Sequence, residues 1–409
     1  MTAQEPFVIV GGGLAGAKAA ETLRAEGFDG RVVLVAGEEE LPYERPPLSK
    51  GYLLGTADRE SPRVHAADWY GEQGVELRTG VRATRLDPAT HRLTLDTGEE
   101  LPYAKLLLAT GSSARRLPVP GADLDGVRYL RNLPDADRLL ADFTGGGRRV
   151  VLVGAGWIGL EVAAAARHHG NDVTIVEPQS TPLHAVLGPE MGRVFARLQR
   201  EHGVELFTDT IVREIRGADG RVESVATDGH AGLAADVVVV GVGAIPNVEL
   251  AAAAGLDVDN GVVTDHALRT SAPDVFAAGD VASSFHPLFG RYVRVEHWAN
   301  ALNGGPAAAR SMLGQEVSYD RVPYFYSDQY DLGMEYSGLG SPGDTVVTRG
   351  NPDDGAFIAF WLQDGRVTAG MNVNVWDVTD PIQELIRTRR QVPVASLIDA
   401  DTPLERLAA

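Results

Sequence analysis

The hydrophobic and polar positions of the chain follow the same order in two separate stretches. Residues 7–16, "FVIVGGGLAG", are a short apolar run, typical of a buried strand, that ends in closely spaced glycines. Residues 150–161, "VVLVGAGWIGLE", repeat this order. Each stretch leads into an alanine-rich run that favours a helix. The pattern therefore predicts two strand–turn–helix units.

Both predicted turns carry glycines at the spacing GxGxxG. They are Gly11, Gly13 and Gly16 in the first turn and Gly154, Gly156 and Gly159 in the second. Such a turn collects backbone N–H groups and a helix N-terminus at one point, where a pyrophosphate can bind. One copy is a weak signal, because glycine also forms tight turns in chains that bind nothing. Two copies in the same context predict two bound dinucleotides.

An acidic residue follows the next predicted strand of each unit. The strand "RVVLV" leads to Glu38, and the strand "DVTIV" leads to Glu177. A carboxylate in this position can accept hydrogen bonds from ribose hydroxyls. Glu177 would also repel a 2′-phosphate, and no arginine lies beside it in "EPQSTP". The second unit is therefore expected to prefer NADH to NADPH.

A later apolar run, in "TSAPDVFAAGDVA" (residues 270–282), ends at Gly279 and Asp280. The glycine permits close approach of a ligand, and the carboxylate can accept a hydrogen bond from a ribityl hydroxyl. The alternative is that Asp280 caps the N-terminus of a helix. In the first interpretation the motif belongs with the first unit, so the chain returns to that unit after completing the second.

Composition narrows the possible classes of function. With 44% hydrophobic and 23% charged residues, the chain is typical of a globular protein. Its apolar runs are too short to span a bilayer and its first residues lack the features of a secretory signal, so we expect a cytoplasmic location. The absence of cysteine excludes disulfides, bound iron–sulfur clusters and a redox-active dithiol, and no metal site is expected. The net charge of -19 disfavours nucleic acid binding.

Eight short motifs follow one another between residue 7 and about residue 335. They are "VIVGGGLAG", "LPYERPPLSKGYL", "LLLATGS", "VGAGWIGLEVAA", "GVGAIPN", "VFAAGD", "EHWANAL" and "YFYSDQYDLG". Together they resemble the FAD-dependent, NADH-linked ferredoxin reductases of bacterial monooxygenase and dioxygenase systems. The resemblance implies FAD and NADH as the two dinucleotides. It also implies a small iron–sulfur ferredoxin as the electron acceptor, docking transiently near the flavin.

The resemblance implies an α/β fold with two Rossmann-like dinucleotide-binding domains, as in disulfide reductases, and an α+β C-terminal domain. The predicted domains are FAD-binding (1–114 and 247–320), NADH-binding (115–246) and C-terminal interface (321–409). In the C-terminal part, "AFIAFWLQDGRVTAGMNVNV" favours two strands around Asp364 and Gly365. The stretch "TDPIQELIRTRR" favours a helix capped by Asp380.

Lys50 and Glu161 are the predicted catalytic residues. By resemblance, the Lys50 ammonium lies beside the flavin ring near N5 and pairs with the Glu161 carboxylate. Glu161 is expected in the first turn of the second unit's helix, where it can hold Lys50 and position the nicotinamide. The alternatives are a solvent-exposed acid favoured by the helix dipole and an ordinary surface lysine.

Further residues are assigned to the cofactors by position or by resemblance. Arg45 and Arg131 are candidates to neutralise the FAD phosphates, and Trp298 is expected against the flavin ring. The alternatives are solvated arginines and a core tryptophan. The remaining predicted cofactor contacts are Ala15, Val81, Ala109, Thr110, Gly111, Ile158 and Gly243. One departure from the family is "YFYSD", residues 324–328, where tryptophans are usual.

These assignments predict a flavoprotein reductase. NADH would pass a hydride from C4 to the flavin N5, and the electrons would leave singly for a ferredoxin that serves a monooxygenase such as a P450 or a ring-hydroxylating dioxygenase. The alternatives are an NADH-dependent reductase of another one-electron acceptor, rubredoxin or monodehydroascorbate, and a slow-turnover redox-sensing flavoprotein. Because ferredoxins are usually acidic, a local basic patch is expected. Its candidates are Arg63, Arg291, Arg294, Arg310 and Arg321.

Overall fold

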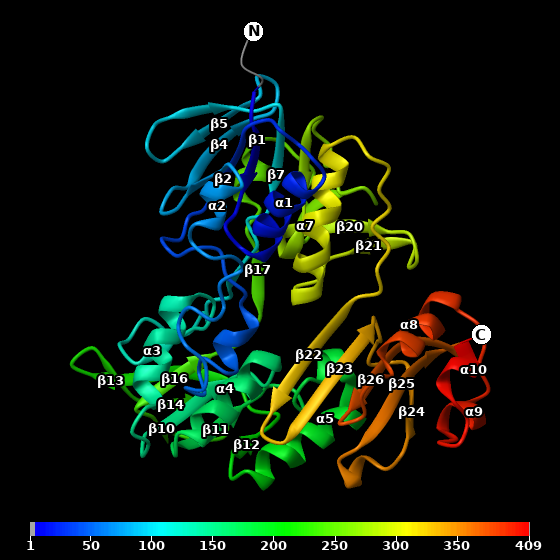
Figure 1. Ribbon diagram of the computed structural model, residues 1–409. Helices are drawn as coiled ribbons and strands as arrows, with labels where there is room; N and C mark the ends of the chain where they lie inside the picture. Colours follow the sequence, from blue (N-terminus) through cyan, green and yellow to red (C-terminus); the bar gives the residue numbers. More distant parts are fainter. Residues whose placement is uncertain (1–4, 409) are drawn as a thin grey trace. The chain divides into compact units, whose positions relative to one another are not determined.

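The computed structural model describes residues 5–408, and the chain divides into two compact units. Unit 1 comprises the chain up to Arg45, Glu60–Ser113 and Ala244–Pro323. Unit 2 comprises Pro46–Arg59, Ala114–Gly243 and the chain from Tyr324 onward. Figure 1 shows the consequence in unit 1, where the blue N-terminal strands and the yellow helix α7 (Trp298–Met312) belong together although they are far apart in the sequence. Both units are therefore discontinuous in sequence, and the three domain boundaries expected above stay a prediction.

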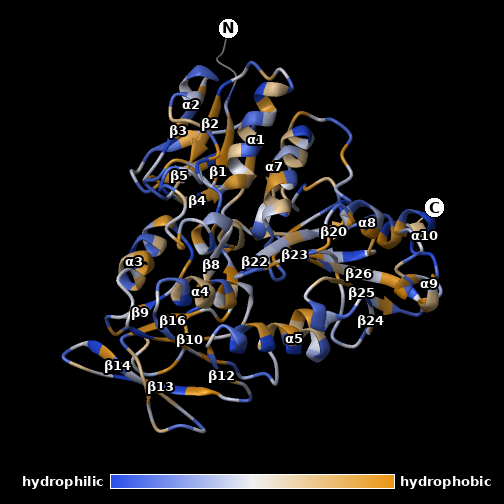
Figure 2. Ribbon diagram, turned by 60° about the horizontal axis from the view of Figure 1, so that its bottom comes forward, coloured by the Kyte–Doolittle hydropathy of each residue, from blue (hydrophilic) through white to orange (hydrophobic). Residues whose placement is uncertain are grey.

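Unit 1 is built on a parallel five-stranded sheet with the order β19-β7-β1-β2-β3. Its strands are β1 (Phe7–Val10), β2 (Val32–Val35), β3 (Val75–Arg78), β7 (Lys105–Leu108) and β19 (Val275–Ala277). Every residue of β1 and β2 is buried, which explains why neither strand alternates hydrophobic and polar positions. Figure 2 shows both strands as hydrophobic. The sequence prediction of a buried strand before the first glycine turn is confirmed.

Helix α1 (Leu14–Ala25) packs tightly against α7 in unit 1. A Cβ atom added to Gly305 of α7 would lie 2.2 Å from the carbonyl oxygen of Ala15, so only glycine allows this approach. The smaller elements of this unit are β4 (Ala83–Asp87), β5 (Arg92–Leu95), β6 (Glu100–Pro102), β18 (Val262–Thr264), β20 (Ala282–His286), β21 (Arg291–Val293), α2 (Trp69–Glu72), α6 (Glu249–Ala253) and the 3₁₀ turn η2 (Gly279–Val281). Strands β8 (Ser112–Ala114) and β17 (Ala244–Pro246) pair where the chain leaves this unit and returns to it.

Unit 2 contains a second parallel five-stranded sheet, with the order β12-β11-β10-β16-β9. Its strands are β9 (Val127–Arg128), β10 (Arg149–Val153), β11 (Asp172–Val176), β12 (Glu205–Phe207) and β16 (Val237–Val240). The other elements of this part are η1 (Pro46–Ser49), α3 (Leu133–Phe143), α4 (Trp157–His168), α5 (His184–Glu201), β13 (Val212–Ala218), β14 (Arg221–Thr227) and β15 (Leu233–Ala234). Strand β10 lies between β11 and β16, as β1 lies between β2 and β7. The two glycine-ended strands therefore hold equivalent central positions.

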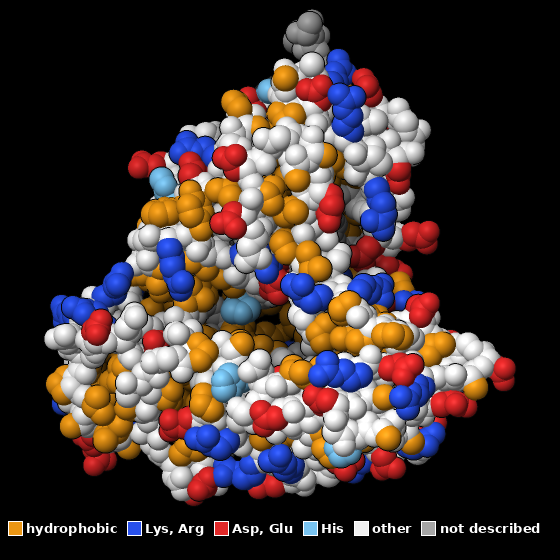
Figure 3. All heavy atoms as spheres, turned by 180° about the vertical axis from the view of Figure 1, so that it is seen from behind, with side chains coloured by type: hydrophobic (Ala, Val, Ile, Leu, Met, Phe, Trp, Pro, Cys, Tyr) orange, Lys and Arg blue, Asp and Glu red, His pale blue; other side chains and the backbone are white. Residues whose placement is uncertain are grey.

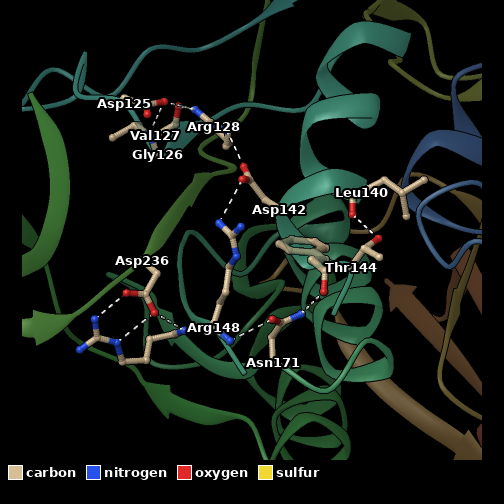
Figure 4. A network of polar contacts seen from close by, with 12 residues as sticks. Asp125, Gly126, Val127, Arg128, Leu140, Asp142, Thr144, Arg148, Asn171 and Asp236 are labelled. Carbon is tan, nitrogen blue, oxygen red and sulfur yellow. Dashed lines mark hydrogen bonds and ion pairs between the residues drawn. The ribbon is translucent and has the colours of Figure 1, made fainter. Parts of the chain in front are cut away.

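A network of polar contacts joins α3 to neighbouring strands in unit 2 (Figure 4). Arg128 Nε donates to one carboxylate oxygen of Asp142 at 2.7 Å, and Arg148 Nη1 donates to the other at 3.2 Å. The Asn171 side-chain amide donates to the carbonyl of Phe143 at 3.0 Å. These contacts fix the C-terminal end of α3 beside the start of β10.

The C-terminal part of unit 2 is an antiparallel five-stranded sheet with the order β22-β23-β26-β25-β24. Its elements are β22 (Tyr324–Gln329), β23 (Leu332–Gly338), β24 (Thr345–Arg349), η3 (Pro352–Asp354), β25 (Phe357–Gln363), β26 (Arg366–Val373), α8 (Thr379–Thr388), α9 (Val394–Ile398) and α10 (Leu404–Ala408). The predicted hairpin is confirmed, because β25 pairs with β26 and the turn residues Asp364 and Gly365 have φ values of 50° and 72°. The predicted capping by Asp380 is wrong. Helix α8 begins at Thr379 with Val378 as its N-cap, two residues earlier than a cap at Asp380 would give, so Asp380 lies inside its first turn.

Candidate functional site

The glycine turn of unit 1 gives each of its glycines a separate role. Gly11 has a φ of 127°, and a Cβ there would lie 2.0 Å from the carbonyl oxygen of Ala109. A Cβ on Gly16 would lie 2.0 Å from the carbonyl oxygen of Gly11, so the third glycine lets α1 approach β1 closely. A Cβ on Gly13, the N-cap of α1, would meet nothing within 4 Å. The turn is therefore tight on the protein side and open where a pyrophosphate can approach the first N–H groups of α1.

The glycine turn of unit 2 has the same construction. Gly154 has a φ of 99°, and a Cβ there would lie 2.4 Å from the carbonyl oxygen of Gly241. A Cβ on Gly159 would lie 2.3 Å from the carbonyl oxygen of Gly154. Gly156 caps α4 and has open space around its missing Cβ, and the side chain of Ile158 in the first turn of α4 is 45% exposed. Both turns therefore fit a dinucleotide phosphate by the same geometry.

The predicted residues of unit 1 gather at the carboxyl ends of its parallel strands. Ala109 directly follows β7, and Ala36 directly follows β2. The Val81 N–H donates to the carbonyl of Ala36 at 3.0 Å, which holds Val81 beside the end of β2. Thr110 Oγ1 donates to the carbonyl of Asn247 at 2.8 Å, and the Asn247 amide donates to the carbonyl of Thr110 at 2.7 Å. In open α/β sheets this edge is where ligands bind. Gly111, which accepts a hydrogen bond from Asn247, lies at the same edge.

Glu38 and Arg45, both predicted to contact FAD, bind each other. Arg45 Nη2 donates to Glu38 Oε1 at 2.8 Å, and the Tyr43 hydroxyl donates to the other oxygen of Glu38. Burial opposes the charge on Arg45, but Tyr43, Glu38 and Asp280 outweigh it and raise the pKa of the guanidinium. The Arg45 guanidinium therefore stays charged and interacts electrostatically with the carboxylates of Glu38 and Asp280.

Asp280 lies inside the 3₁₀ turn η2 and is not its N-cap, so the capping alternative is wrong. Its carboxylate accepts a hydrogen bond from Ser112 Oγ at 2.9 Å, and Gly279 before it has a φ of 77°. Burial lowers the pKa of His297 to about 4 against the opposing charge of Asp280, so this imidazole is neutral at pH 7. Trp298 Nε1 donates to Glu44 at 3.0 Å, which fixes the indole ring in unit 1.

Glu177 joins the glycine turn of unit 2 to the end of β11. One of its oxygens accepts the N–H of Ala155 at 2.7 Å, and the other accepts the N–H of Gln179 at 2.9 Å. A carboxylate oxygen has lone pairs for more than one donor, so these bonds leave capacity for a ribose hydroxyl. Gly243 follows β16 with a φ of 98°, and the Arg131 N–H donates to Asp135 at 3.0 Å at the start of α3.

The predicted pair of Lys50 and Glu161 is present within unit 2. Lys50 Nζ donates to Glu161 Oε1 at 2.8 Å, and Glu161 is only 3% exposed. The expectation that Glu161 lies in the first turn of its helix is wrong, since it is the fifth residue of α4. The alternative of a solvent-exposed acid is also wrong. Its burial is tolerable because the carboxylate is paired with a cation and hydrogen-bonded.

Three residues around this pair were not identified from the sequence. Ser49 Oγ and Ser327 Oγ both donate to Glu161, the latter at 2.7 Å, and the Lys50 ammonium lies 5.1 Å from the centre of the Tyr326 ring. Ser49 precedes Lys50 directly, which was a usable signal. Ser327 and Tyr326 come from β22, far along the chain, and no spacing rule connects them to Glu161.

Two parallel sheets, each with a glycine turn open to a phosphate, define a protein with two dinucleotide-binding folds. The family model described as pyridine nucleotide-disulphide oxidoreductase matches residues 5–305, and the model described as reductase C-terminal matches residues 324–408. The chain therefore belongs to the pyridine nucleotide-disulphide oxidoreductase family, and this membership implies FAD and NAD(H) as its cofactors. The resemblance found in the sequence and the expected α/β fold class are confirmed.

Individual relatives are similar over nearly the whole chain. The ferredoxin–NAD(+) reductase component of the anthranilate 1,2-dioxygenase system of Burkholderia cepacia is 45% identical, covering 91% of each chain. Putidaredoxin reductase of Pseudomonas putida is 37% identical, covering 100% of this chain and 98% of that one. Among solved structures, the covalent putidaredoxin reductase–putidaredoxin complex matches with a TM-score of 0.95 and 36% identity, covering 99% of this chain and 98% of that one.

Among the residues that the structure describes, no helix is both long and apolar enough to cross a membrane. Within the same residues, no group of three or more histidine and acidic side chains is arranged to hold a metal ion.

Proposed function

We propose that this protein is an NADH-dependent ferredoxin reductase that passes electrons through FAD to a small [2Fe-2S] ferredoxin serving an oxygenase. The single observation that carries the proposal is the buried pair of Lys50 and Glu161, in a chain that has two dinucleotide turns and no cysteine. Disulfide reduction on this fold needs a thiol, so the electrons must leave by another route. The names of the relatives support a ferredoxin as that acceptor.

FAD, when bound, accepts a hydride equivalent from NADH and releases its electrons one at a time. The residues of the chain bind and orient the cofactors around that chemistry. Gly13 and Gly156 leave room for the two pyrophosphates, and Glu38 and Glu177 would accept hydrogen bonds from ribose hydroxyls. Lys50, held by Glu161, would offer its ammonium to the flavin and so favour added negative charge there.

The remaining predicted cofactor contacts are part of the same proposal. Asp280 would accept a hydrogen bond from the ribityl chain, Trp298 would pack against the flavin, and Arg131 would offer a cation to the FAD phosphates. We also propose a cytoplasmic location, because NADH is supplied in that compartment.

Ferredoxin docking requires a local basic surface on a chain with a net charge of -19. Of the candidate arginines, Arg63 pairs with Glu60 and Arg310 with Glu26, each at 2.8 Å, which reduces their value as free cations. Arg294 pairs with Glu296 in the same way. Lys and Arg are interspersed with Asp and Glu on the face shown in Figure 3. We therefore propose the exposed Arg291 and Arg321 as the first docking residues to test.

The deciding experiment is anaerobic reduction of the purified holoprotein by one equivalent of NADH, followed by cytochrome c reduction with and without a [2Fe-2S] ferredoxin. Rapid bleaching of the flavin and ferredoxin-dependent cytochrome reduction are expected. Rapid bleaching without ferredoxin dependence would favour rubredoxin or monodehydroascorbate as the acceptor. Slow bleaching would favour the redox-sensing alternative.

A further inference from the structure

The Glu161 carboxylate is the end point of a chain of buried hydrogen bonds. Tyr330 Oη donates to Gln199 Oε1 at 3.0 Å, and Gln199 Nε2 donates to Gln329 Oε1 at 3.0 Å. Gln329 Nε2 donates to Ser327 Oγ at 3.3 Å, and Ser327 Oγ donates to Glu161 Oε1 at 2.7 Å. Gln199 and Ser327 are 0% exposed and Gln329 is 1% exposed. These three side chains are as buried as the apolar core around them.

Every donor in the chain is directed toward the carboxylate. Aligned hydrogen bonds polarise one another, so the last donor, Ser327, binds a charged acceptor more strongly than an isolated hydroxyl would. Two of the links are side-chain amides, Gln199 and Gln329, which orient their neighbours and do not readily transfer protons. The chain therefore serves to hold the carboxylate and not to relay protons to it.

Ser327 differs from the other two donors to Glu161 in its origin. Ser49 and Lys50 are adjacent residues of the segment Pro46–Arg59, so a shift of that segment moves both donors together. Ser327 comes from β22 and donates to the same oxygen, Oε1, that accepts the Lys50 ammonium. It is the contact that fixes this oxygen independently of the lysine segment.

We propose that Ser327 is a positioning residue for the reduction of the flavin by NADH. Its hydroxyl fixes the rotation of the Glu161 carboxylate, and the carboxylate in turn sets the direction of the Lys50 ammonium. This inference rests on the proposed function, because it uses the role assigned there to Lys50. Ser327 lies outside the glycine-turn motif, on strand β22.

The test compares Ser327→Ala and Ser327→Cys with the control Ser337→Ala. Ser337 lies on the adjacent strand β23, is 1% exposed, and bonds Gln383 and not Glu161, so it matches Ser327 in size and burial. Each holoprotein is mixed with NADH anaerobically, and the rate of flavin reduction, the visible flavin spectrum and the flavin midpoint potential are measured. We expect Ser327→Ala to slow reduction roughly tenfold or more and to alter the spectrum and potential. The thiol is a weak donor, so Ser327→Cys should fall between alanine and the wild type, while Ser337→Ala should match the wild type.

A second background separates positioning from a general packing effect. In Lys50→Met, Ser327→Ala should cause little further loss, because the two residues act through the same carboxylate. Wild-type flavin reduction and an unchanged spectrum in Ser327→Ala would overturn the inference, as would an undiminished loss in the Lys50→Met background. If Ser327→Ala does not fold, a wild-type rate in Ser327→Cys overturns it equally. Failure of the wild type itself to be reduced by NADH would instead defeat the proposed function.

Discussion

The ammonium of Lys50 lies 2.8 Å from the carboxylate of Glu161 across 111 residues of sequence. Further contacts hold the lysine segment in unit 2. Leu53 is fully buried in that unit's core, and its carbonyl accepts a hydrogen bond from His169 Nε2 at 2.8 Å. Tyr52 Oη donates to Asp137 of α3. The position of Lys50 is therefore set by unit 2, which contains the second glycine turn. The residues that precede this segment in the sequence, up to Arg45, belong to unit 1.

Replacement of Glu161 by glutamine tests this pair. The amide keeps the size of the side chain but leaves the Lys50 ammonium without its counter-charge, so the free energy of unfolding should fall by about 3 kcal/mol. Flavin reduction by NADH should slow by roughly tenfold or more, because the ammonium loses its fixed direction. Urea unfolding and anaerobic stopped-flow absorbance measure the two effects.

The matched control is the double variant Glu161→Gln with Lys50→Met, in which no unpaired buried charge remains. It should regain part of the lost stability but none of the lost rate. A single Glu161→Gln variant with the wild-type reduction rate would contradict the role given to the pair.

The glycine turns allow stability and cofactor binding to be separated. Gly156 has a φ of -78° and open space around its missing Cβ, so Gly156→Ala should fold with an unchanged melting temperature. The methyl group would occupy the approach path of the phosphates and raise the KM for NADH by roughly tenfold. Gly159→Ala would place a Cβ 2.3 Å from the Gly154 carbonyl and should lower the free energy of unfolding by about 2 kcal/mol or more. Steady-state kinetics and thermal unfolding distinguish these outcomes.

The corresponding change in unit 1, Gly13→Ala, serves as the control for cofactor identity. It should reduce the FAD content of the purified protein and leave the KM for NADH of the remaining holoprotein unchanged. If Gly13→Ala raised only the KM for NADH, the assignment of the two dinucleotides would be reversed.

Much of the fold was predictable because its signals are local. Buried parallel strands are uniformly apolar, and the turns after β1 and β10 need glycine at fixed spacing for steric reasons visible at Gly11 and Gly154. The hairpin at Asp364 and Gly365 was predictable because both turn residues adopt positive φ. In each of these places, a short piece of sequence determines its own geometry.

The missed features depend on residues far apart in the chain. Ser327 reaches Glu161 across 166 residues, and no local pattern predicts that contact. The start of α8 was misplaced because Val378 already has a helical backbone (φ -114°, ψ 0°), although Asp380 before a proline has the composition of a cap. Tertiary context decided both outcomes.

The preference for NADH over NADPH is expected to depend on Glu177. Its carboxylate repels a 2′-phosphate, so kcat/KM should favour NADH by roughly a hundredfold in the wild type. Glu177→Gln keeps an acceptor for one of the two backbone N–H groups but removes the charge, and should narrow this ratio by roughly tenfold. Glu205→Gln removes an exposed acid from the neighbouring strand β12 and is expected to leave the ratio unchanged. An unchanged ratio in Glu177→Gln would mean that another residue selects the cofactor.

The ion pair between Arg149 and Asp236 in unit 2 predicts a pH dependence of stability. Asp236 is labelled in Figure 4. Arg149 Nη2 donates to one oxygen of Asp236 at 2.6 Å, and its backbone N–H donates to the other at 2.9 Å. The side-chain hydrogen bond from Arg149 is the main cause that lowers the pKa of Asp236 to about 2, against a smaller opposing effect of burial. Because the carboxylate is partly exposed, its contribution to the free energy of unfolding is about 1 kcal/mol at neutral pH.

The sign follows from the lowered pKa of the folded state. The contribution of Asp236 is complete above about pH 5, where the unfolded carboxyl is also ionised, and is lost as the pH falls toward about 2. The difference in unfolding free energy between the wild type and Asp236→Asn should therefore be equal at pH 7 and pH 5 and smaller at pH 3. Urea unfolding at the three values measures it, with Glu223→Gln on β14 as a charge-matched control that should show no such trend. A difference that grows at pH 3 would show that Asp236 does not stabilise the fold as an ionised partner of Arg149.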